Sequence, residues 1–379
     1  MTRRISSTLT MHSEVRPDGT LELTLKTVPL DEPSADEVVV EIRAAPLHPA
    51  DIGLLLGPAD LSSAHRTGQG QETRMVFRIP PERLGALSSR TGKSLPIGNE
   101  GAGVVIAAGG LYSGLIGKPV AVMGGAMISR YRIVKGGDCL LLPTGCSIPQ
   151  GAAALINPLT ALTMIETMRA EGHVALVHTA AASSLGQMLN RICIQDRIPL
   201  VSIVRKREQA ALLIGQGAQH VCDSSGPTFI EDLNAHVAAT RSTLAFDAVG
   251  GGPLAGQILS AMERSCSALP TEYSRYGSSI YKKVYFYGGL NTGATQLDRS
   301  YGMAWGVGGW LVFDKLTQMT PDTLTSLRTR ICSELQTTFS TEFTGELSMT
   351  DALELDNIMA FAERRTGAKW LINPQRPLG

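Results

Sequence analysis

Three small residues with the potential to bind an anion lie in the stretch 177–189, "VHTAAASSLGQML", where an apolar run gives way to a helical pattern. Ala181, Ser183 and Gly186 occupy the three glycine positions of the spacing GxGxxG. That spacing binds pyrophosphate because free backbone N–H groups and the dipole of the following helix attract negative charge. Ser183 could donate its hydroxyl to a phosphate oxygen, Gly186 would let the helix pack close to the strand, and Ala181 can hold the turn only with a negative φ. A well-packed strand–turn–helix without a ligand explains the same pattern, and this alternative stays open.

A basic group follows the next apolar run, "PLVSIV", and consists of Arg205, Lys206 and Arg207. A site for NAD needs an acidic residue at this position to hold the ribose hydroxyls, whereas a cationic group favours the 2′-phosphate of NADP. The alternative is the solvated basic start of a helix, although positive charge at a helix N-terminus is mildly unfavourable. The pattern therefore predicts NADPH as the cofactor.

Both features need a sheet to position them, and the sequence beyond about residue 173 predicts one. Short apolar runs alternate there with helical patterns, which is typical of a doubly wound α/β fold with a parallel sheet covered on both faces. Two further runs end in glycine-rich turns, "AVGGG" at 248–252 and "YGGL" at 287–290. Such sheets bind ligands at the carboxyl ends of their strands.

The chain before this region has a different pattern. Short strands with glycine turns at 20–45 and 98–145 predict a β-rich, barrel-like domain. Residues 60–95 are polar and are interpreted as a long loop or a partly helical insertion, and 312–379 is predicted to fold back onto the first domain with a final strand, "KWLINP". The predicted domains are therefore 1–156 with 312–379, and 157–311.

Composition limits the partners. The 379 residues carry 34 basic and 34 acidic side chains with no basic tract, which argues against nucleic acid or an anionic membrane as a main partner. The six cysteines form no CxxC pair and are expected to be free buried thiols. No signal-like segment is apparent and no apolar stretch is judged long enough to span a membrane, so a cytoplasmic protein is expected.

Three motifs in this order resemble the medium-chain dehydrogenase/reductase superfamily: "GNEGAGVV" at 98–105, "NPLTAL" at 157–162 and "HTAAASSLGQ" at 178–187. The chain looks most like the zinc-free NADPH:quinone oxidoreductase branch and is also similar to the enoyl thioester reductases. The resemblance implies a GroES-like domain, a Rossmann domain, a cleft between them for the nicotinamide, and a homodimer.

The resemblance also implies which residues contact NADPH. The nicotinamide end is assigned to Thr160, Gly289, Leu290, Trp310 and Leu311. The pyrophosphate is assigned to Ala181, Ser183 and Leu185, the 2′-phosphate to Arg205 and Lys206, and the adenosine–ribose side to Val249, Gly250 and Gly251.

No metal is expected. The positions that match the catalytic zinc ligands of the superfamily are His48, Asn99 and the region of Asn157, and zinc prefers thiolate and imidazole to asparagine. The four closely spaced cysteines of a structural zinc lobe are also absent.

Without zinc, the oxyanion that forms on hydride transfer needs a hydrogen-bond donor. His48 is the best candidate for a donor or proton source, and a structural histidine is weighed equally. Asn157 could donate or orient, and a helix N-cap is its alternative. Glu100 is interpreted as structural.

Enoyl thioester reductases carry a tyrosine shortly after the segment that reads "HPADIGLLLGPADL" here, and this chain has none. A substitute could come from the insert at 264–283, which carries Tyr273, Arg275, Tyr276 and Tyr281; an oligomer contact is weighed equally. The predicted function is hydride transfer from NADPH to a quinone or an α,β-unsaturated carbonyl. An enoyl-CoA or enoyl-ACP reductase and a catalytically silent NADP-binding protein are the alternatives.

Overall fold

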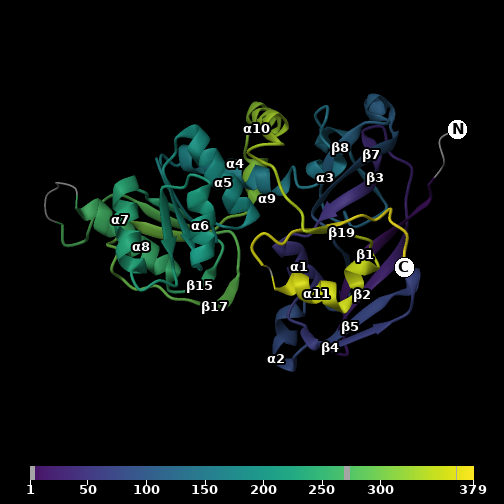
Figure 1. Cartoon of the computed structure of the whole chain (residues 1–379), viewed down its shortest axis with the longest axis horizontal. Coiled ribbons are helices and arrows are strands. Elements are labelled where there is room, and N and C mark those ends of the chain that lie inside the picture. Colours follow the sequence, from purple (N-terminus) through teal and green to yellow (C-terminus); the bar gives the residue numbers. More distant parts are fainter. Residues whose placement is uncertain (1–4, 269–273, 364) are drawn as a thin grey trace. The chain divides into compact units, whose positions relative to one another are not determined.

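The computed structural model describes residues 5–268, 274–363 and 365–379. The chain divides into two compact units (Figure 1). The first comprises the residues up to Ile156 together with Arg330–Gly379, and the second is Asn157–Thr329.

The first unit is built on two sheets whose strand order is β4-β5-β2-β1-β6 in one and β10-β8-β7-β3-β20-β19 in the other, with β9 also pairing with β3. All of these pairs are antiparallel except β19 with β20. The strands are β1 (Ser7–Val15), β2 (Thr20–Pro29), β3 (Glu37–Pro46), β4 (Asp60–Thr67), β5 (Arg74–Arg78), β6 (Ser94–Pro96), β7 (Glu100–Ala108), β8 (Pro119–Met123), β9 (Tyr131–Lys135), β10 (Leu140–Leu141), β19 (Gly345–Leu347) and β20 (Trp370–Ile372). The helices are α1 (Pro49–Leu56), α2 (Pro81–Leu84), α3 (Ile148–Gly151) and α11 (Leu355–Ala362).

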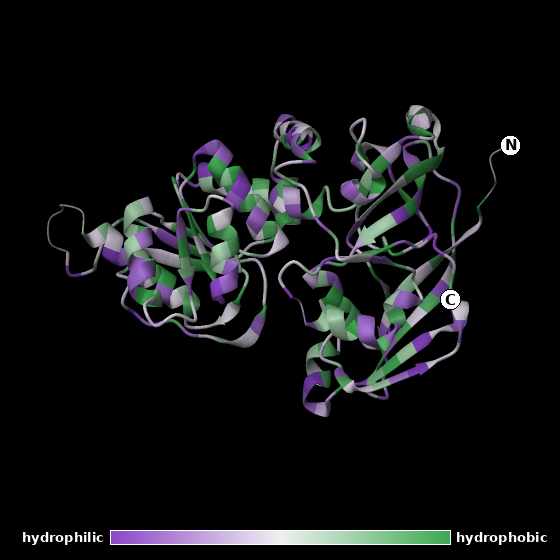
Figure 2. Cartoon of the chain, in the orientation of Figure 1, coloured by the Kyte–Doolittle hydropathy of each residue, from purple (hydrophilic) through white to green (hydrophobic). Residues whose placement is uncertain are grey.

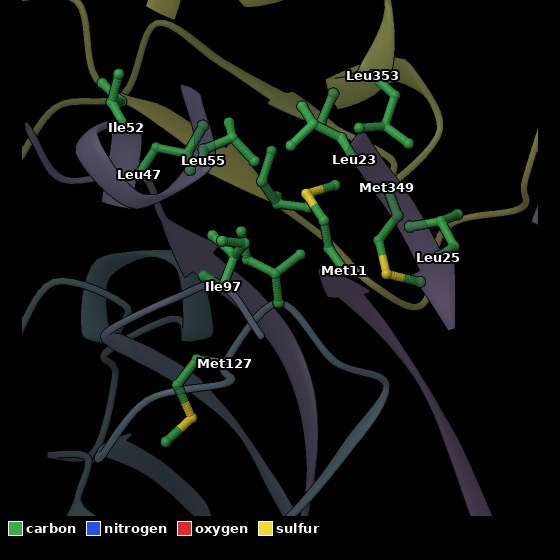
Figure 3. Packing of buried hydrophobic residues seen from close by; sticks show 14 of the residues in the cluster. Met11, Leu23, Leu25, Leu47, Ile52, Leu55, Ile97, Met127, Met349 and Leu353 are labelled. Atoms are coloured by element: carbon green, nitrogen blue, oxygen red, sulfur yellow. The ribbon is translucent and has the colours of Figure 1, made fainter. Parts of the chain in front are cut away.

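One apolar cluster fills the interior of this unit, and it draws on segments far apart in the sequence. Met11, Leu23 and Ile97 come from the early part of the chain, whereas Met349 and Leu353 come from the C-terminal return (Figure 3). The C-terminal strand β20 pairs with β3, with Leu371 opposite Pro46. The predicted return of the C-terminus onto the first domain therefore occurs through both sheet pairing and core packing.

The interpretation of 60–95 as a long loop or partly helical insertion is wrong in its main part. The segment forms the hairpin β4–β5, which extends the first sheet beyond β2, followed by α2 and a short 3-10 helix at Gly85–Leu87. Its polar composition misled the prediction because β4 exposes most of its side chains, whereas Met75 and Phe77 of β5 are buried.

The second unit is a six-stranded sheet with the order β13-β12-β11-β14-β16-β18, and every neighbouring pair is parallel. By position in the chain this is the order 3-2-1-4-5-6 of a doubly wound dinucleotide-binding fold, which confirms the predicted fold class. The strands are β11 (Leu176–Thr179), β12 (Leu200–Val204), β13 (His220–Asp223), β14 (Leu244–Asp247), β16 (Lys282–Phe286) and β18 (Trp305–Gly309), and a separate parallel pair joins β15 (Gly250–Gly252) to β17 (Asn291–Thr295).

The helices of this unit are α4 (Ile156–Ala170), α5 (Ser184–Asp196), α6 (Arg207–Gly215), α7 (Phe229–Thr240), α8 (Leu254–Ser267), α9 (Val312–Thr317) and α10 (Pro321–Glu334), of which α4 begins and α10 ends in the first unit. Figure 2 shows hydrophobic colours along the central strands and alternating colours on the helices. All residues of β11, β12 and β14 are buried, as a sheet covered on both faces requires.

The second boundary lies at 329/330, whereas the sequence predicted 311/312. The added segment belongs to the sheet unit because Lys315 of α9 lies over the ring of Tyr285 of β16, with its Nζ 5.7 Å from the ring centre. In the sequence, the residues of α9 gave no sign that the helix would contact Tyr285.

The segment Ile148–Ala170 is long and apolar enough to cross a membrane by length and composition, contrary to the expectation from the sequence. It contains α3 and α4 rather than one continuous helix, and 78% of its apolar window is buried within the protein. Pro158 does not interrupt it, because α4 begins at Ile156 and a proline in the first turn lacks only an N–H that would have no helical partner. Burial of this kind is typical of a core helix.

Candidate functional site

The predicted cofactor residues of the second unit, apart from Thr160 on α4, follow the ends of sheet strands at one edge. Each predicted segment follows the carboxyl end of a parallel strand, and these ends share an edge because the strands run in the same direction. The segments begin at Ala180 after β11, Arg205 after β12, Ala248 after β14, Tyr287 after β16 and Trp310 after β18.

The turn after β11 has the backbone conformation that the prediction required. The positive φ of 52° falls on Ala180, and the buried Ala181 is not among the residues with positive φ. Ser183 caps α5, since its Oγ accepts the N–H of Gly186 at 3.1 Å. The hydroxyl proton of Ser183 stays available for a phosphate oxygen, so capping and ligand binding are compatible. Leu185 follows in the first turn of α5 and is half-buried.

Gly186 allows α5 to approach this turn closely. A Cβ at this position would lie 2.2 Å from the carbonyl oxygen of Ala181 and 2.7 Å from its Cα. No side chain fits there without moving backbone, which agrees with the packing role expected for this glycine.

The basic residues after β12 are available to an anionic ligand. Arg205 and Lys206 are both exposed, and Lys206 is the residue that precedes α6. Among the residues that the structure describes, neither side chain has a charged partner. The Arg205 backbone N–H is held by Gln209 Oε1 at 3.2 Å, which fixes the chain direction at this point.

Asp247, which the sequence reasoning missed, organises the turn after β14. It is 1% exposed, and its carboxylate accepts the Thr179 hydroxyl at 2.6 Å, the Val249 N–H at 2.8 Å and the Gly250 N–H at 3.2 Å. The Thr179 hydroxyl in turn accepts the Ala248 N–H at 2.8 Å. An aspartate directly before a glycine-rich turn was the available signal, because a buried carboxylate needs several donors.

Close backbone contact joins the turns after β14 and β16. Leu290 N–H donates to the Ala248 carbonyl at 3.0 Å, and a Cβ at Gly251 would lie 2.7 Å from the Gly293 carbonyl oxygen. Gly250 has a φ of 82°, while Gly289 and Leu290 are exposed on the same edge. These turns therefore bring the predicted adenosine and nicotinamide segments together.

A buried pair beneath these turns was also missed. His178 of β11 and Tyr287 after β16 stack with ring centres 5.6 Å apart, and His178 Nε2 lies 2.7 Å from the Tyr287 hydroxyl. Burial lowers the pKa of His178 to about 3, so the imidazole is neutral and this contact adds no charge to the site.

Three predicted residues occupy core or helix positions. The Trp310 ring is 6% exposed, donates from Nε1 to the Thr167 hydroxyl at 3.2 Å and packs edge-on against Phe246, so it is a core residue of this unit. Thr160 is also buried, on α4, whereas Leu311 is 52% exposed at the start of α9.

Asn157 lies within α4 and donates from Nδ2 to the Ser184 hydroxyl at 3.3 Å. Its interpretation as a helix N-cap is wrong, because the helix already begins at Ile156. The contact places the Asn157 amide beside the first residue of α5.

In the first unit, His48 belongs to a buried hydrogen-bond network. It precedes α1 and is 4% exposed, and its Nε2 lies 2.7 Å from Glu100 Oε1. Glu100 Oε2 accepts the N–H groups of Leu155 at 2.8 Å and Ile156 at 3.0 Å. Glu100 thus joins β7 to the starts of α1 and α4, which agrees with its structural interpretation. His48 can donate to a substrate only after its Nε2 leaves Glu100.

Lys369 is a further buried charge near this network that the sequence reasoning did not find. Its Nζ has no hydrogen-bond partner among the described residues, and it lies over the Phe343 ring at 5.8 Å from the ring centre. Burial lowers the pKa of Lys369 to about 8, while the carboxylates of Glu100 and Asp51 favour its charged form. Burial also raises the pKa of Asp51, whose carboxylate accepts hydrogen bonds from the backbone N–H of His48 and from the side-chain amide of Asn99.

The insert tyrosines that the structure describes, Tyr276 and Tyr281, lie toward the amino edge of this sheet. The insert at 264–283 connects α8 to the beginning of β16, so its end lies at the amino edge of the parallel strands. Tyr281 lines a pocket of about 580 Å³ there, together with Glu171, His173 and Lys283. Arg275 lies over the ring of the exposed Tyr276, and Tyr273 lies outside the described residues.

Comparison with known proteins identifies the architecture. No protein-family model matches the sequence. A mitochondrial enoyl-acyl-carrier-protein reductase from Xenopus tropicalis is 27% identical over 241 residues, which are 60% of this chain and 60% of that relative. A structure from Mesorhizobium loti described as an NADPH:quinone reductase superposes with a TM-score of 0.72 at 21% identity, covering 98% of this chain and 99% of its own.

A further solved structure, which contains NADP and crotonyl-CoA, has a TM-score of 0.66 at 18% identity and covers 97% of this chain and 100% of its own. The chain has the fold of these two solved structures. The two-domain fold that the three sequence motifs implied is therefore confirmed.

The zinc ligands of the superfamily have no equivalent set here. The imidazole of His48 is bound to Glu100, and the matching position Asn99 uses its amide to bind Asp51. Across the described ranges, no three His, Cys, Asp or Glu side chains gather as metal ligands. Within the first unit the matching positions therefore offer one imidazole and one amide, which suit hydrogen bonding better than zinc.

Proposed function

We propose that the chain is a zinc-independent, NADPH-dependent reductase that transfers hydride to a quinone or an α,β-unsaturated carbonyl. The observation that carries the proposal is the carboxyl edge of the parallel sheet. This edge has the strand order of a dinucleotide-binding fold and carries the capped N-terminus of α5 and the turn held by Asp247. It also carries Arg205 and Lys206, which have no charged partner among the described residues.

The residues present fit NADPH. The first turn of α5 offers backbone N–H groups and the Ser183 hydroxyl to a pyrophosphate, and Gly186 keeps the helix close to the sheet. Arg205 and Lys206 are suited to a 2′-phosphate because a guanidinium and an ammonium bind phosphate oxygens strongly. Several fold neighbours support the cofactor, since one is described with NADP and another with NADPH.

The bound nicotinamide would supply the hydride, and the chain must then stabilise the oxyanion left on the substrate. We propose His48 and Asn157 for this role. When His48 turns away, Glu100 Oε2 keeps its two backbone donors but Oε1 loses the imidazole, so the new hydrogen bond to the substrate must offset the loss at this buried carboxylate oxygen. The Asn157 amide makes a hydrogen bond of 3.3 Å to Ser184, which a stronger acceptor can replace.

A substrate panel with both NADPH and NADH tests the proposal. It should contain a quinone, an enone and a short enoyl-CoA, with cofactor oxidation followed by absorbance. We expect turnover of the quinone or the enone with NADPH in preference to NADH. Binding of NADPH no tighter than a control nucleotide in a tryptophan-fluorescence titration would refute the proposal, and any NADPH turnover would exclude a catalytically silent protein.

An enoyl-thioester reductase is the second candidate. The 27% identity to an enoyl-acyl-carrier-protein reductase and the neighbour with crotonyl-CoA favour it. The lack of a tyrosine between His48 and Leu61 counts against it, and the insert tyrosines that the structure describes lie toward the opposite edge of the sheet. Turnover of the enoyl-CoA without turnover of quinones would decide in its favour.

We also propose a cytoplasmic homodimer. β18 forms one edge of the sheet, and its sequence, "WGVGG", contains none of the charges or prolines that protect exposed edges. None of the six cysteines forms a disulfide, as in proteins of a reducing compartment, although only Cys193, Cys222 and Cys266 are buried as expected and the other three are half-buried. Sedimentation of the purified chain would test the oligomeric state, and a monomer would refute it.

A further inference from the structure

Two histidines of the second unit lie close together, and neither belongs to the segments predicted to contact the cofactor. His220 begins β13 and His236 lies on α7, which packs against that strand. Their Nδ1 atoms are 3.1 Å apart, and the rings cross at 68° with centres 5.1 Å apart. Both side chains are half-buried, so solvent reaches the pair.

The 3.1 Å separation fits chelation of one metal ion by both nitrogens. Imidazole nitrogens bind Zn²⁺ at about 2.0–2.1 Å, which places two ligand nitrogens about 2.9 Å apart at a right angle and about 3.4 Å apart at the tetrahedral angle. The observed distance lies between these values. Rotation of the two half-exposed rings away from their mutual hydrogen bond would aim both lone pairs at one ion.

The positions of the protons on the two imidazole rings allow a metal ion to replace the present hydrogen bond. The present contact is an N–H···N hydrogen bond, so one ring carries its proton on Nδ1 and the other on Nε2. Ion binding needs both Nδ1 atoms bare, and each neutral ring then keeps one proton on Nε2.

The surroundings select the kind of ion. Cys222 lies two residues after His220 on the same face of β13, but it is fully buried, whereas the two histidines are half-buried. Asp232 lies one turn before His236 on α7 and adds negative charge to that face. Two imidazoles with water in the remaining positions suit Ni²⁺, Cu²⁺ or Zn²⁺ and not Mg²⁺ or Ca²⁺, which prefer oxygen.

We propose that His220 and His236 form a surface site for one divalent transition-metal ion that clamps α7 to the edge strand β13. The site is separate from the proposed reductase chemistry and uses none of its residues. Metal binding there would stabilise the second unit because the ion binds the folded arrangement of strand and helix.

Calorimetric titration of metal-stripped protein with NiCl₂, and separately with ZnCl₂, tests the proposal. The wild type should bind one ion per chain, and H220Q and H236Q should each weaken binding at least about tenfold because one of two protein ligands is lost. H65Q is the matched control, since His65 is an exposed histidine of β4 in the other unit. Equal binding by wild type, H220Q and H236Q would overturn the site, as would loss of binding in H65Q or displacement of Ni²⁺ by equimolar Mg²⁺.

A measurement on the unchanged protein guards against variants that fail to fold. Substoichiometric Ni²⁺ is paramagnetic and should broaden the ring NMR signals of two of the seven histidines. Those two signals should belong to His220 and His236, and broadening of other histidine signals in their place would also overturn the proposal.

Discussion

Gly186→Ala is expected to damage both stability and cofactor binding, because the new Cβ would enter occupied space. It would lie 2.2 Å from the Ala181 carbonyl oxygen, 2.6 Å from the carbonyl carbon and 2.7 Å from the Cα. These atoms are backbone and cannot swing away as a flexible side chain could. Relief of the clash therefore requires α5 and the turn after β11 to separate by about 1 Å, since nonbonded carbon atoms prefer about 3.5–4 Å.

Two opposing effects set the size of the change. Overpacking of this kind lowers the stability of a protein by about 1–3 kcal/mol. Replacing glycine by alanine in a helix raises the stability by at most about 1 kcal/mol. We expect the free energy of unfolding in urea to fall by about 1–2 kcal/mol. The affinity for NADPH should fall up to about 100-fold, because a displacement of about 1 Å separates the α5 N–H groups from the pyrophosphate.

Gly215→Ala is the matched control for this variant. Gly215 is also a helical glycine of the second unit, at the end of α6, and a Cβ there would meet nothing within 4 Å. Urea unfolding and fluorescence titration with NADPH should show the control to be at least as stable as the wild type with unchanged affinity. If Gly186→Ala behaves like this control in both measurements, the close-packing argument is refuted.

Three further predictions concern charges. Arg205→Ala combined with Lys206→Ala should raise the KM for NADPH about tenfold or more and leave that for NADH almost unchanged, since only NADPH has the 2′-phosphate; equal effects on both cofactors would contradict the assignment. Asp247→Asn should lower the free energy of unfolding by about 1–3 kcal/mol. The reason is that a neutral amide cannot accept from the hydroxyl of Thr179 and two backbone N–H groups as a carboxylate does. An unchanged midpoint of urea unfolding would show that this network does not contribute to stability. The pKa of Lys369 is about 8 in the folded protein and 10.5 normally. Between pH 8 and pH 10.5 the unfolded chain therefore holds a proton on Lys369 that the folded protein has lost. The stability of the wild type relative to Lys369→Met should therefore rise by up to about 3 kcal/mol as pH increases from 8 to 10.5, and a flat or falling difference in urea unfolding would contradict the burial argument.

Elements governed by local pattern were predictable from the sequence. The apolar run at 173–179 and the small residues after it predicted a strand, a turn and a helix, and the structure has β11 in the second half of that run, followed by the turn and α5. The same holds for β12 and the basic residues at its end, because a strand apolar throughout and the charges that terminate it are neighbours in the chain.

Local pattern failed where a distant partner decides the outcome. The polar segment 60–95 becomes a hairpin because β2 offers it a free edge, and 312–329 joins the sheet unit, where Lys315 lies over the ring of Tyr285. The insert at 264–283 carried aromatic residues that suggested catalysis, but the direction of β16 places its end at the amino edge.

The sequence by itself determined the alternation of strands and helices, the position of the small-residue turn and the cationic end of β12, since each depends on residues a few positions apart. Only the tertiary structure decided that Asp247 holds the turn beside Thr179, that Glu100 binds His48 and the start of α4, and that Lys369 is buried near both carboxylates. Those contacts join residues 52 to more than 300 positions apart, and the burial that makes them strong exists only after the strands have paired.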